Sequence, residues 1–325
     1  MSLLLILVSG MVLIVLSADY FTNGIEWLGY VLGMDEGAVG SLLAALGTAL
    51  PETLVPIMAM AFGANQVNDA IGLGAILGAP LMLATLAFMI IGIGLWSNGR
   101  VQPRLDPGPI ERDLRFFLGG FGLAVAAGFL PEVWHKPIAA ALVLAYVVHA
   151  WRLLHHNTTK AEPAPPAERL HLSFRPIPRR AMVFLQVAMA LLGLILGAHF
   201  FVVALDRASS FLKMSGFLLS VIITPVATEL PEVLNSVLWI RRDKDTLAFG
   251  NVTGAMAFQA TVVPALGMAL TSWRLNGWEL AAALLGWSSA AFVFWQNRRA
   301  RIKRGPLMLA GIFYLAFIAL VIATA

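Results

Sequence analysis

The stretch Ala227-Thr228-Glu229-Leu230-Pro231-Glu232-Val233 (ATELPEV) lies in the middle of a long apolar segment of the chain. Its two glutamates and its proline are residues that a helix surrounded by lipid disfavours. A charged side chain at the centre of such a helix costs on the order of 2.5 to 3.5 kcal/mol, and proline removes a backbone donor. Residues retained at such a cost indicate a function, which the rest of the sequence helps to define.

Composition identifies the chain as a membrane protein. Of its 325 residues, 59% are hydrophobic and only 12% are charged, whereas soluble domains carry about 25% charged residues. Apolar runs long enough to cross the hydrocarbon core, which takes about 20 residues, recur along almost the whole sequence. The expected spans are residues 2–18, 37–62, 69–97, 114–131, 136–154, 181–205, 215–240, 246–272, 279–296 and 306–324. We therefore predict an all-α integral membrane protein of about ten transmembrane helices.

A second copy of the opening stretch occurs in the first half of the chain. Residues 47–53 read GTALPET, and they align with ATELPEV when 180 is added to each residue number. The aligned pairs are Thr48 with Thr228, Leu50 with Leu230, Pro51 with Pro231, and Glu52 with Glu232. Further matches are ADYF at 18–21 with AHFF at 198–201, and, at an offset of 176, Gly74 and Gly78 with Gly250 and Gly254. Similarity that persists over such a distance predicts an internal repeat.

The two copies divide the chain into three parts. We assign residues 1–155 to a first repeat of five spans, residues 156–180 to a Pro-rich, extended cytoplasmic linker that contains AEPAPPAERL, and residues 181–325 to a second repeat of five spans. Because five is an odd number, the second copy enters the membrane from the opposite face. Inverted repeats of this kind are a transporter architecture, with the substrate site near the bilayer midplane where the copies meet.

The prolines predict an interruption of both motif helices at that midplane. Pro51 and Pro231 lack a backbone N–H and clash with the preceding turn, which frees carbonyls at about residues 45–48 and 225–228. Freed carbonyls at membrane depth are tolerated only where protein, water or a bound ion satisfies them. Together with carboxylates and hydroxyls they form a set of hard oxygen donors, which suits Ca²⁺ or Na⁺ and not soft metals.

The candidate ligands share an oxygen donor and a position near the middle of a span; they are Glu52, Glu229, Glu232, Thr48 and Thr228. An alternative is that the glutamates are protonated and only hold helices together. Because Glu52 and Glu232 occupy equivalent positions beside equivalent prolines, we favour cation binding for that pair. Glu229 has no counterpart, since Ala49 occupies the equivalent position, and both interpretations stay open for it.

Basic residues predict the orientation of the chain. With the spans above, 18 of the 22 Lys and Arg residues fall in loops on one face of the membrane, and Lys136, Arg207, Lys213 and Arg274 fall on the other. The positive-inside rule makes the richer face cytoplasmic and places both termini outside. The net charge of +4 therefore reflects topology and contact with anionic headgroups rather than nucleic-acid binding.

These motifs resemble those of a known family. GTALPE and ATELPE, each followed by a Gly-rich helix, are similar to the two alpha-repeats of the prokaryotic sodium/calcium exchangers of the cation/Ca²⁺ antiporter superfamily, over nearly the whole chain. The resemblance implies ten helices, with the second, third, seventh and eighth around the ion sites and the first and sixth sliding past them. It also implies that Glu52 and Glu232 bind Ca²⁺ and Na⁺ competitively. Further implied ligands are Thr48, Thr228 and the carbonyls of Ala45 and Pro225.

The sequence departs from the family pattern at several ligand positions. Where the family usually has Ser after the motif threonine, this chain has Ala49 and Glu229. On the following helix the second copy reads GAMAFQ at 254–259, which makes Gln259 a candidate ligand, while the first copy is apolar at Ala79 and Leu83. The coupling ion therefore stays open between Na⁺ and H⁺, and we expect Glu229 to decide which ion is exchanged.

The combined interpretation is a secondary antiporter that exchanges Ca²⁺ or a related cation for Na⁺ or H⁺ by alternating access in a bacterial-type inner membrane. A passive cation channel and a transport-inactive membrane scaffold are the alternatives. We predict no enzyme activity and no cofactor beyond the transported ions, because cysteine is absent and the intramembrane His149 and His199 are lone residues expected in the core or at the interface. The predicted partners are cations and lipid, without nucleic acid, and the oligomeric state is open, a monomer included.

Overall fold

A computed structural model describes residues 3–32, 44–63, 65–105, 107–156, 166, 168–299 and 302–324, apart from the side chains of 44–48, 107, 154–156, 230–232, 322 and 324. These residues form helices and no strands. The α-helices are α1 (Leu3–Val31), α3 (Ala44–Phe62), α4 (Gln66–Met82), α5 (Phe88–Ser97), α6 (Pro107–Ala127), α7 (His135–His156), α8 (Arg180–Leu212), α9 (Gly216–Arg241), α10 (Asp245–Gln259), α11 (Val262–Leu270), α12 (Gly277–Arg298) and α13 (Arg304–Thr324). A π-helical turn η2 (Leu83–Ala87) joins α4 to α5, and a 3₁₀ turn η3 (Glu132–Trp134) precedes α7.

The described helices confirm an all-helical chain suited to a membrane. Seven segments are long and apolar enough to cross a bilayer, or eight if the two bent parts of α9 count as one span. Within the described residues α3 contributes only a shorter apolar helix, Ala49–Phe62. α6 is not counted among the candidate spans, because four charged residues, at 111, 112, 113 and 115, lie near its start. The number of ten spans stays a prediction.

Several helices extend beyond the spans that the sequence predicts, and α1 and α6 are examples. α1 continues to Val31, whereas the predicted span ends at residue 18. α6 begins at Pro107 and ends at Ala127, whereas the predicted span covers residues 114–131. Polar residues end an apolar run without ending a helix, so hydropathy marks the lipid-facing part of a helix rather than its full length.

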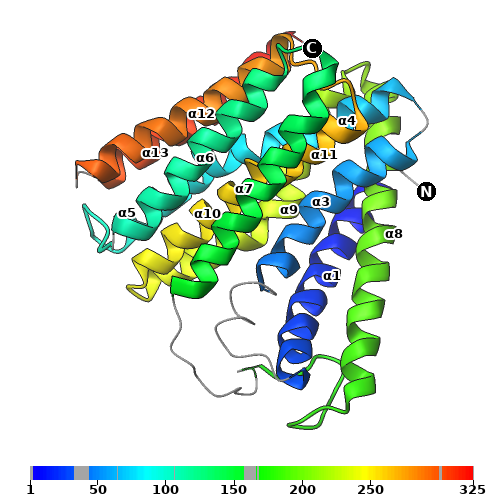
Figure 1. Ribbon diagram of the computed structural model, residues 1–325, viewed down its shortest axis with the longest axis vertical. Helices are drawn as coiled ribbons and strands as arrows, with labels where there is room; N and C mark the ends of the chain where they lie inside the picture. The colour runs from blue at the N-terminus through cyan, green and yellow to red at the C-terminus, as the bar shows by residue number, and fades with distance from the viewer. Residues whose placement is uncertain are drawn as a thin grey trace.

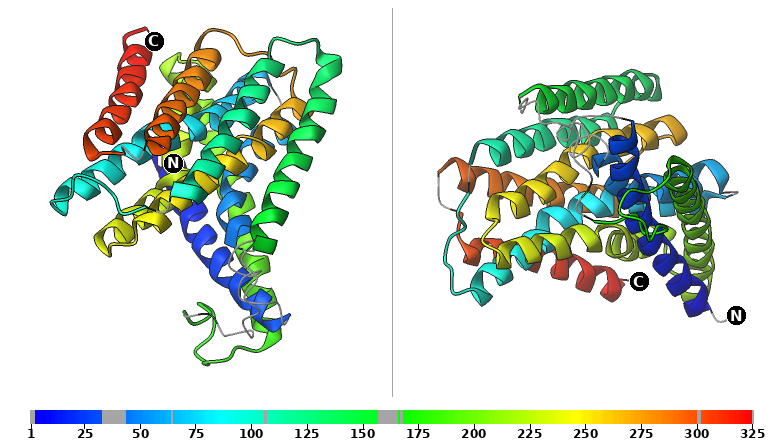
Figure 2. Two further views of the ribbon diagram at one scale, coloured as in Figure 1. Left: turned by 60° about the vertical axis from the view of Figure 1, so that its left-hand side comes forward. Right: turned by 90° about the horizontal axis from the view of Figure 1, so that it is seen from below.

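The longest helices, α1 and α8, lie side by side and project from the rest of the bundle (Figures 1 and 2). Glycines allow their backbones to approach closely. A Cβ atom on Gly10 of α1 would lie 3.0 Å from the backbone nitrogen of Phe201, and one on Gly197 of α8 would lie 3.0 Å from the backbone nitrogen of Ile14. Small residues at such crossings let helices pack in lipid by close van der Waals contact.

α4 packs along α9, the helix that carries ATELPEV. A Cβ atom on Gly74 would lie 2.6 Å from the Phe217 carbonyl oxygen, and one on Gly78 would lie 2.6 Å from the Val221 carbonyl oxygen. Ser220 also donates a hydrogen bond of 2.6 Å to the Ile71 carbonyl. The first-copy glycines that the repeat singles out therefore hold α4 against the motif helix of the second half.

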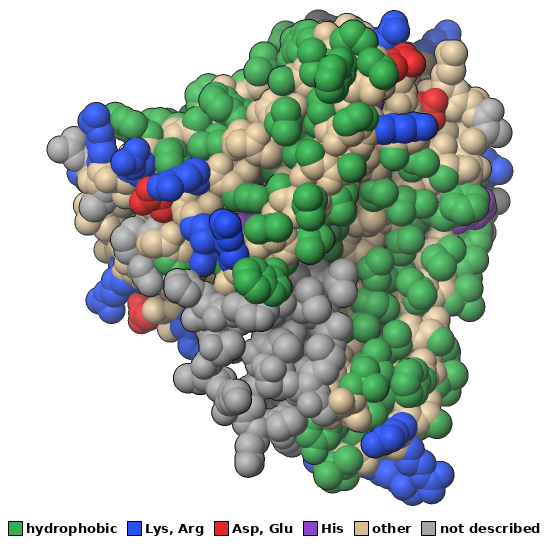
Figure 3. All heavy atoms as spheres, viewed as in Figure 1, with side chains coloured by type: hydrophobic (Ala, Val, Ile, Leu, Met, Phe, Trp, Pro, Cys, Tyr) green, Lys and Arg blue, Asp and Glu red, His purple; other side chains and the backbone are tan. Residues whose placement is uncertain are grey.

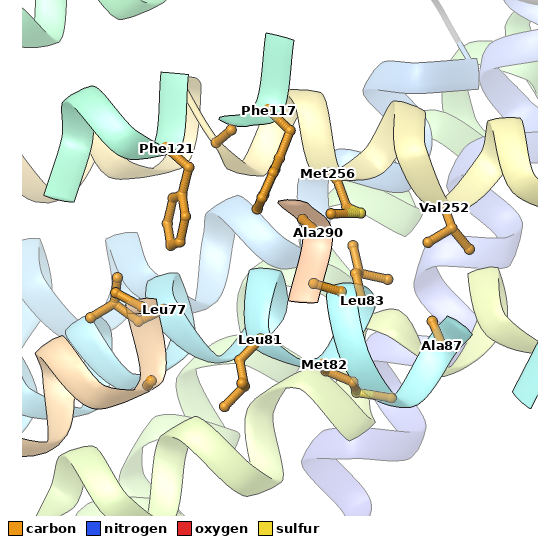
Figure 4. Close-up of a cluster of buried hydrophobic side chains, with 14 of the residues drawn as sticks. Leu77, Leu81, Met82, Leu83, Ala87, Phe117, Phe121, Val252, Met256 and Ala290 are labelled. Carbon is orange, nitrogen blue, oxygen red and sulfur yellow. The ribbon is translucent and has the colours of Figure 1, made fainter. Parts of the chain in front are cut away.

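An apolar core surrounds α4 on its other side. Phe117 and Phe121 of α6 project toward α4, where Leu77 and Leu81 lie, with Met256 of α10 beside them (Figure 4). These five side chains are buried. The core holds α6, α10 and α12 against α4 and so fixes the helices that surround the polar residues described below.

The described end of the predicted linker is bound to α1 and α8. Asn23 Nδ2 of α1 donates to the Arg169 carbonyl at 3.1 Å, and the Leu172 amide donates to Gln186 Oε1 of α8 at 2.9 Å. Polar side chains of two helices therefore hold residues 168–173, which include a turn at 171–172. The extended conformation predicted for the linker as a whole stays a prediction.

The surface has the distribution of side chains that a bilayer requires. Hydrophobic side chains cover much of the described part of the face seen in Figure 3, and most of its Lys and Arg side chains lie toward its margins. Large hydrophobic residues are exposed along α1, α7, α8, α12 and α13. Such a surface faces lipid, with its charged margins at the headgroups.

Candidate ion-binding site

A buried polar cluster lies where α3, α9 and α10 meet. It contains Glu52 of α3, Thr228 and Glu229 of α9, and Gln259 of α10, which are all less than 7% exposed. The side chain of Glu52 lies beside that of Glu229, close enough for the two carboxyl groups to interact. Gln259 Nε2 donates to Glu229 Oε1 at 2.6 Å, and Thr228 Oγ1 donates to the same oxygen at 3.4 Å. Side chains from both halves of the chain therefore converge on one buried carboxyl group.

Two carboxyl groups in contact need a proton or a cation between them. Ionised carboxylates repel each other, and a hydrogen bond between them requires that one carries a proton. Among the described residues, Glu229 Oε2 and Gln259 Oε1 are buried and accept no hydrogen bond. Carboxylate and amide oxygens are the donors that Na⁺ and Ca²⁺ prefer. The residues present therefore suit a hard cation or protons as alternative occupants.

Pro231 interrupts α9 beside this cluster. The part of α9 from Gly216 to Glu229 is inclined by 47° to the part from Val233 to Arg241. Proline lacks an N–H and clashes with the preceding turn, so a bend here is the result predicted from the sequence. The bend divides α9 into two half-helices, the first of which ends at Glu229.

The equivalent interruption of the first copy stays a prediction. α3 runs from Ala44 through Pro51 and Pro56 to Phe62 as one helix. Residues 33–43, which precede it, lie outside the described residues.

Of the eight predicted ligands, the structure brings together Glu52, Glu229, Thr228 and Gln259. The side chains of Glu232, Thr48 and Ala45 lie outside the described residues. The described part of the chain contains no group of three or more His, Asp or Glu side chains suited to a metal ion. The role of Glu232 as a ligand therefore stays a prediction.

Pro225 lies in α9 at its contact with α4. A Cβ atom added to Gly78 of α4 would be 2.8 Å from Pro225 Cγ, so the proline ring packs against that glycine. The role of the Pro225 carbonyl as a ligand stays a prediction.

Two threonines that the sequence left without a role stand at breaks in neighbouring helices. Thr85 lies in η2, and its hydroxyl donates to the Leu81 carbonyl. Thr261 lies between α10 and α11 and donates to the Ala257 carbonyl at 2.9 Å. Adding 176 to 85 and 81 gives 261 and 257. The repeat therefore contained a signal for both breaks, which occur at equivalent positions.

Tyr146 of α7 is a further neighbour that the sequence did not single out. It lies within electrostatic range of Glu52 and Asp113. Its ring meets that of Phe258 edge-on, with 5.3 Å between the centroids, and Phe258 adjoins Gln259 in sequence. The feature of the sequence that could have drawn attention to Tyr146 was its position within the predicted span 136–154.

Comparisons with known proteins identify the family. The family model described as sodium/calcium exchanger protein matches residues 2–154 and 182–323. The putative antiporter CaxA of Alkalimonas amylolytica is 26% identical over 276 residues, which are 79% of this chain and 77% of that relative.

Solved structures share the fold. The H⁺/Ca²⁺ exchanger CAX superposes with a TM-score of 0.74 at 15% sequence identity, over 99% of this chain and 87% of its own. The sodium-calcium exchanger NCX_Mj superposes with a TM-score of 0.62 at 16% identity, over 98% of this chain and 99% of its own. At these identities the likeness concerns the fold alone. Because the family model covers nearly all of both halves, the chain belongs to the sodium/calcium exchanger family.

Proposed function

We propose that this protein is a secondary active antiporter that exchanges Ca²⁺ or a related cation for Na⁺ or H⁺ by alternating access. The observation that carries the proposal is the buried contact between Glu52 and Glu229. Two adjacent carboxyl groups among apolar helices do not stay ionised without a counter-charge. The printed names of the relatives, a putative antiporter and an H⁺/Ca²⁺ exchanger, support the same class of function.

Competition for one pair of carboxyl groups accounts for exchange. A divalent cation offsets both negative charges, and Na⁺ ions or protons offset them as well. An uncompensated charge at membrane depth costs on the order of 2.5 to 3.5 kcal/mol. The carboxyl pair therefore becomes accessible from the other side of the membrane only when one of these occupants is bound. This requirement gives antiport and prevents uncoupled ion flow.

We also propose ten spans arranged as two inverted repeats, residues 1–155 and 181–325, joined by the linker 156–180. The packing supports this arrangement, because α6 packs along α10 whereas α12 packs along α4. Likewise α7 packs on α11 whereas α13 packs on α5. The breaks at Thr85 and Thr261 supply a further matched pair.

In the proposed cycle α1 and α8 move as a unit past the helices that hold the site. Their close glycine contacts join them to each other, and both also pack on α3, which carries Glu52. The proposed location is the inner membrane with both termini outside, as the basic loops predict.

Uptake of radioactive Ca²⁺ by purified protein in proteoliposomes tests the proposal. We expect uptake that depends on an outward Na⁺ or H⁺ gradient, and its loss in Glu52→Gln and in Glu232→Gln. Undiminished uptake in both variants overturns the site. Ion current without coupling to a gradient identifies a channel, and cation binding without any flux identifies a scaffold.

A further inference from the structure

A groove runs between α12 and α13, the orange and red helices of Figure 2, and its volume is about 430 Å³. This volume falls within the range of about 300–1,000 Å³ that small-molecule sites have. Four of the apolar side chains that line it are between 40% and 56% exposed, so the groove opens at the surface that faces lipid. The apolar lining consists of Leu285 and Phe292 of α12 and Leu309, Ala310, Ile312 and Phe313 of α13.

The lining offers little to a polar ligand. Besides the apolar side chains it contains two serines and, among the described residues, no charged side chain. Ser289 is 5% exposed and donates a hydrogen bond of 2.5 Å to the Ala84 carbonyl of η2. Its hydroxyl proton is therefore already used within the protein, whereas Ser288 lies at the surface. A ligand here must be mainly hydrocarbon, because a polar group among these side chains would lose its hydrogen bonds to water.

Two aromatic rings connect the groove to the basic end of α12. Phe292, which lines the groove, stacks with Trp295, with 6.3 Å between the ring centroids. The guanidinium carbon of Arg299 lies 4.3 Å from the centroid of the Trp295 ring. Residues three and four apart share one face of a helix. This face of α12 therefore leads from the apolar groove directly to a positive charge.

The spacing along α12 matches the depth of one leaflet. Phe292 and Leu285 precede Arg299 by seven and 14 residues, which is about 10 and 21 Å along a helix. One leaflet, headgroups included, is about 20–22 Å thick. A lipid whose phosphate lies at Arg299 therefore has its acyl chains at the depth of the groove.

Positive charge exceeds negative charge at this end of the groove. Arg298 pairs with Glu111 of α6 at 3.6 Å, and Glu111 also pairs with Arg115. Within the part of the chain that the structure describes, neither Arg299 nor Lys303 forms an ion pair. Both side chains are exposed, so they have capacity for an anion from outside the protein.

We propose that the groove binds one acyl chain of an anionic phospholipid whose phosphate is held by Arg299 and Lys303. A guanidinium forms charge-assisted hydrogen bonds to phosphate oxygens, and basic pockets between membrane helices bind anionic headgroups. With the proposed orientation the lipid belongs to the cytoplasmic leaflet. Lipid binding here is independent of which ions the protein exchanges.

A second copy of the chain fits the groove less well. Membrane proteins related by a two-fold axis along the membrane normal present equal ends of their helices to each other. The basic residues at the end of α12 would then face the same residues of the second copy, and like charges repel. A lipid phosphate meets these residues with the opposite charge.

Native mass spectrometry of the full-length protein in detergent tests the headgroup contact, with phosphatidylglycerol and phosphatidylcholine of identical acyl chains as probes. We expect the first phosphatidylglycerol to bind at least about fivefold more tightly than phosphatidylcholine. Arg299→Gln should lower the phosphatidylglycerol affinity by about fivefold and change that of phosphatidylcholine by less than about twofold. Arg242→Gln, which removes an exposed arginine at the end of α9, is the matched control and should change neither affinity.

Ser288→Phe tests the groove itself. Ser288 lines the groove and is exposed, so the new ring fills the space that the acyl chain needs. Binding of the first phosphatidylglycerol and of the first phosphatidylcholine should both weaken by about tenfold or more, because a buried methylene group contributes about 0.8 kcal/mol and several are displaced. Ser9→Phe, at an exposed serine of α1, is the matched control and should leave both affinities unchanged.

Three results overturn the lipid site. Unchanged phosphatidylglycerol affinity in Arg299→Gln, or an equal loss in Arg242→Gln, shows that lipid is held only in the general annulus around the protein. Unchanged lipid binding in Ser288→Phe together with a lower fraction of dimer identifies a second copy of the chain as the occupant. If Ser288→Phe does not fold, Arg299→Gln decides, because it changes an exposed side chain.

Discussion

Gln259 Nε2 donates a hydrogen bond of 2.6 Å to Glu229 Oε1 and thereby joins α10 to α9 within the buried carboxyl cluster. The bond uses one donor of the amide and one oxygen of the carboxyl group. Glu229 Oε2 and Gln259 Oε1 accept no hydrogen bond from the described residues. The contact therefore holds two oxygen acceptors, one from each helix, in place for a cation.

Gln259→Leu should weaken Ca²⁺ binding by about tenfold or more. The variant removes a hydrogen bond to an acidic group, worth about 1.5–3 kcal/mol, and each 1.4 kcal/mol is about a factor of ten in affinity. Calorimetric titration with Ca²⁺ measures the change. Gln296→Leu on α12 is the control, because Gln296 Nε2 is buried without a hydrogen-bond partner among the described residues. An unchanged Kd in Gln259→Leu would contradict the role of the bond.

Glu229→Gln should lower the affinity for Ca²⁺ more than the affinity for Na⁺. The substitution removes one of two adjacent negative charges, and a divalent cation loses more Coulomb energy than a monovalent one. We expect the ratio of the two affinities to fall by about tenfold or more, which competition binding measures. Glu279→Gln, in the first turn of α12, is the control. Equal losses for both ions would indicate that Glu229 has a structural role only.

The sequence was sufficient to predict the family and to name all four residues of the described site as candidate ligands. The proline and the repeat single out Glu52, the cost of a buried charge draws attention to Glu229, and the family model confirms the resemblance. The hydrogen bond between Gln259 and Glu229 was not predictable, although both were candidate ligands. Periodicity shows which face of a helix is buried, but not which residue of another helix that face meets.

The ends of α1 and α6 show why hydropathy misses polar residues with tertiary partners. Asn23 continues α1 beyond the apolar run because its side chain bonds to the Arg169 carbonyl, the His171 amide and Gln186. Asp113 was placed outside the membrane for the same reason, yet it is buried against His149. Hydrogen-bond and ion-pair partners distant in sequence allow these polar residues to be buried. A hydropathy window covers only neighbours in sequence and therefore does not detect such partners.

Gly78→Ala should destabilise the protein through the contact between α4 and α9. The new Cβ atom would lie 2.6 Å from the Val221 carbonyl oxygen, a backbone atom that no side-chain rotation can move. Overpacking of this kind costs about 1–3 kcal/mol, which a lower Tm in detergent reports. Gly119→Ala on α6 is the control, because a Cβ there meets nothing within 4 Å, and alanine favours the helix. A Tm that does not fall in Gly78→Ala would contradict the packing.

Asp245→Ala should destabilise the junction of α9 and α10 by about 3 kcal/mol, because removing one partner leaves a buried charge uncompensated. Arg100 Nη1 lies 2.7 Å from Asp245 Oδ2, whose side chain is fully buried, and the Arg104 amide donates to the same oxygen at 2.7 Å. Asp243 pairs with the same guanidinium at 3.1 Å, but its side chain is 62% exposed. Asp243 has a φ of 56°, a conformation that asparagine tolerates and alanine does not. Asp243→Asn is therefore the control and should cost less than about 1 kcal/mol. Thermal unfolding in detergent measures both variants, and equal shifts in Tm would show that burial of the Arg100–Asp245 pair contributes nothing.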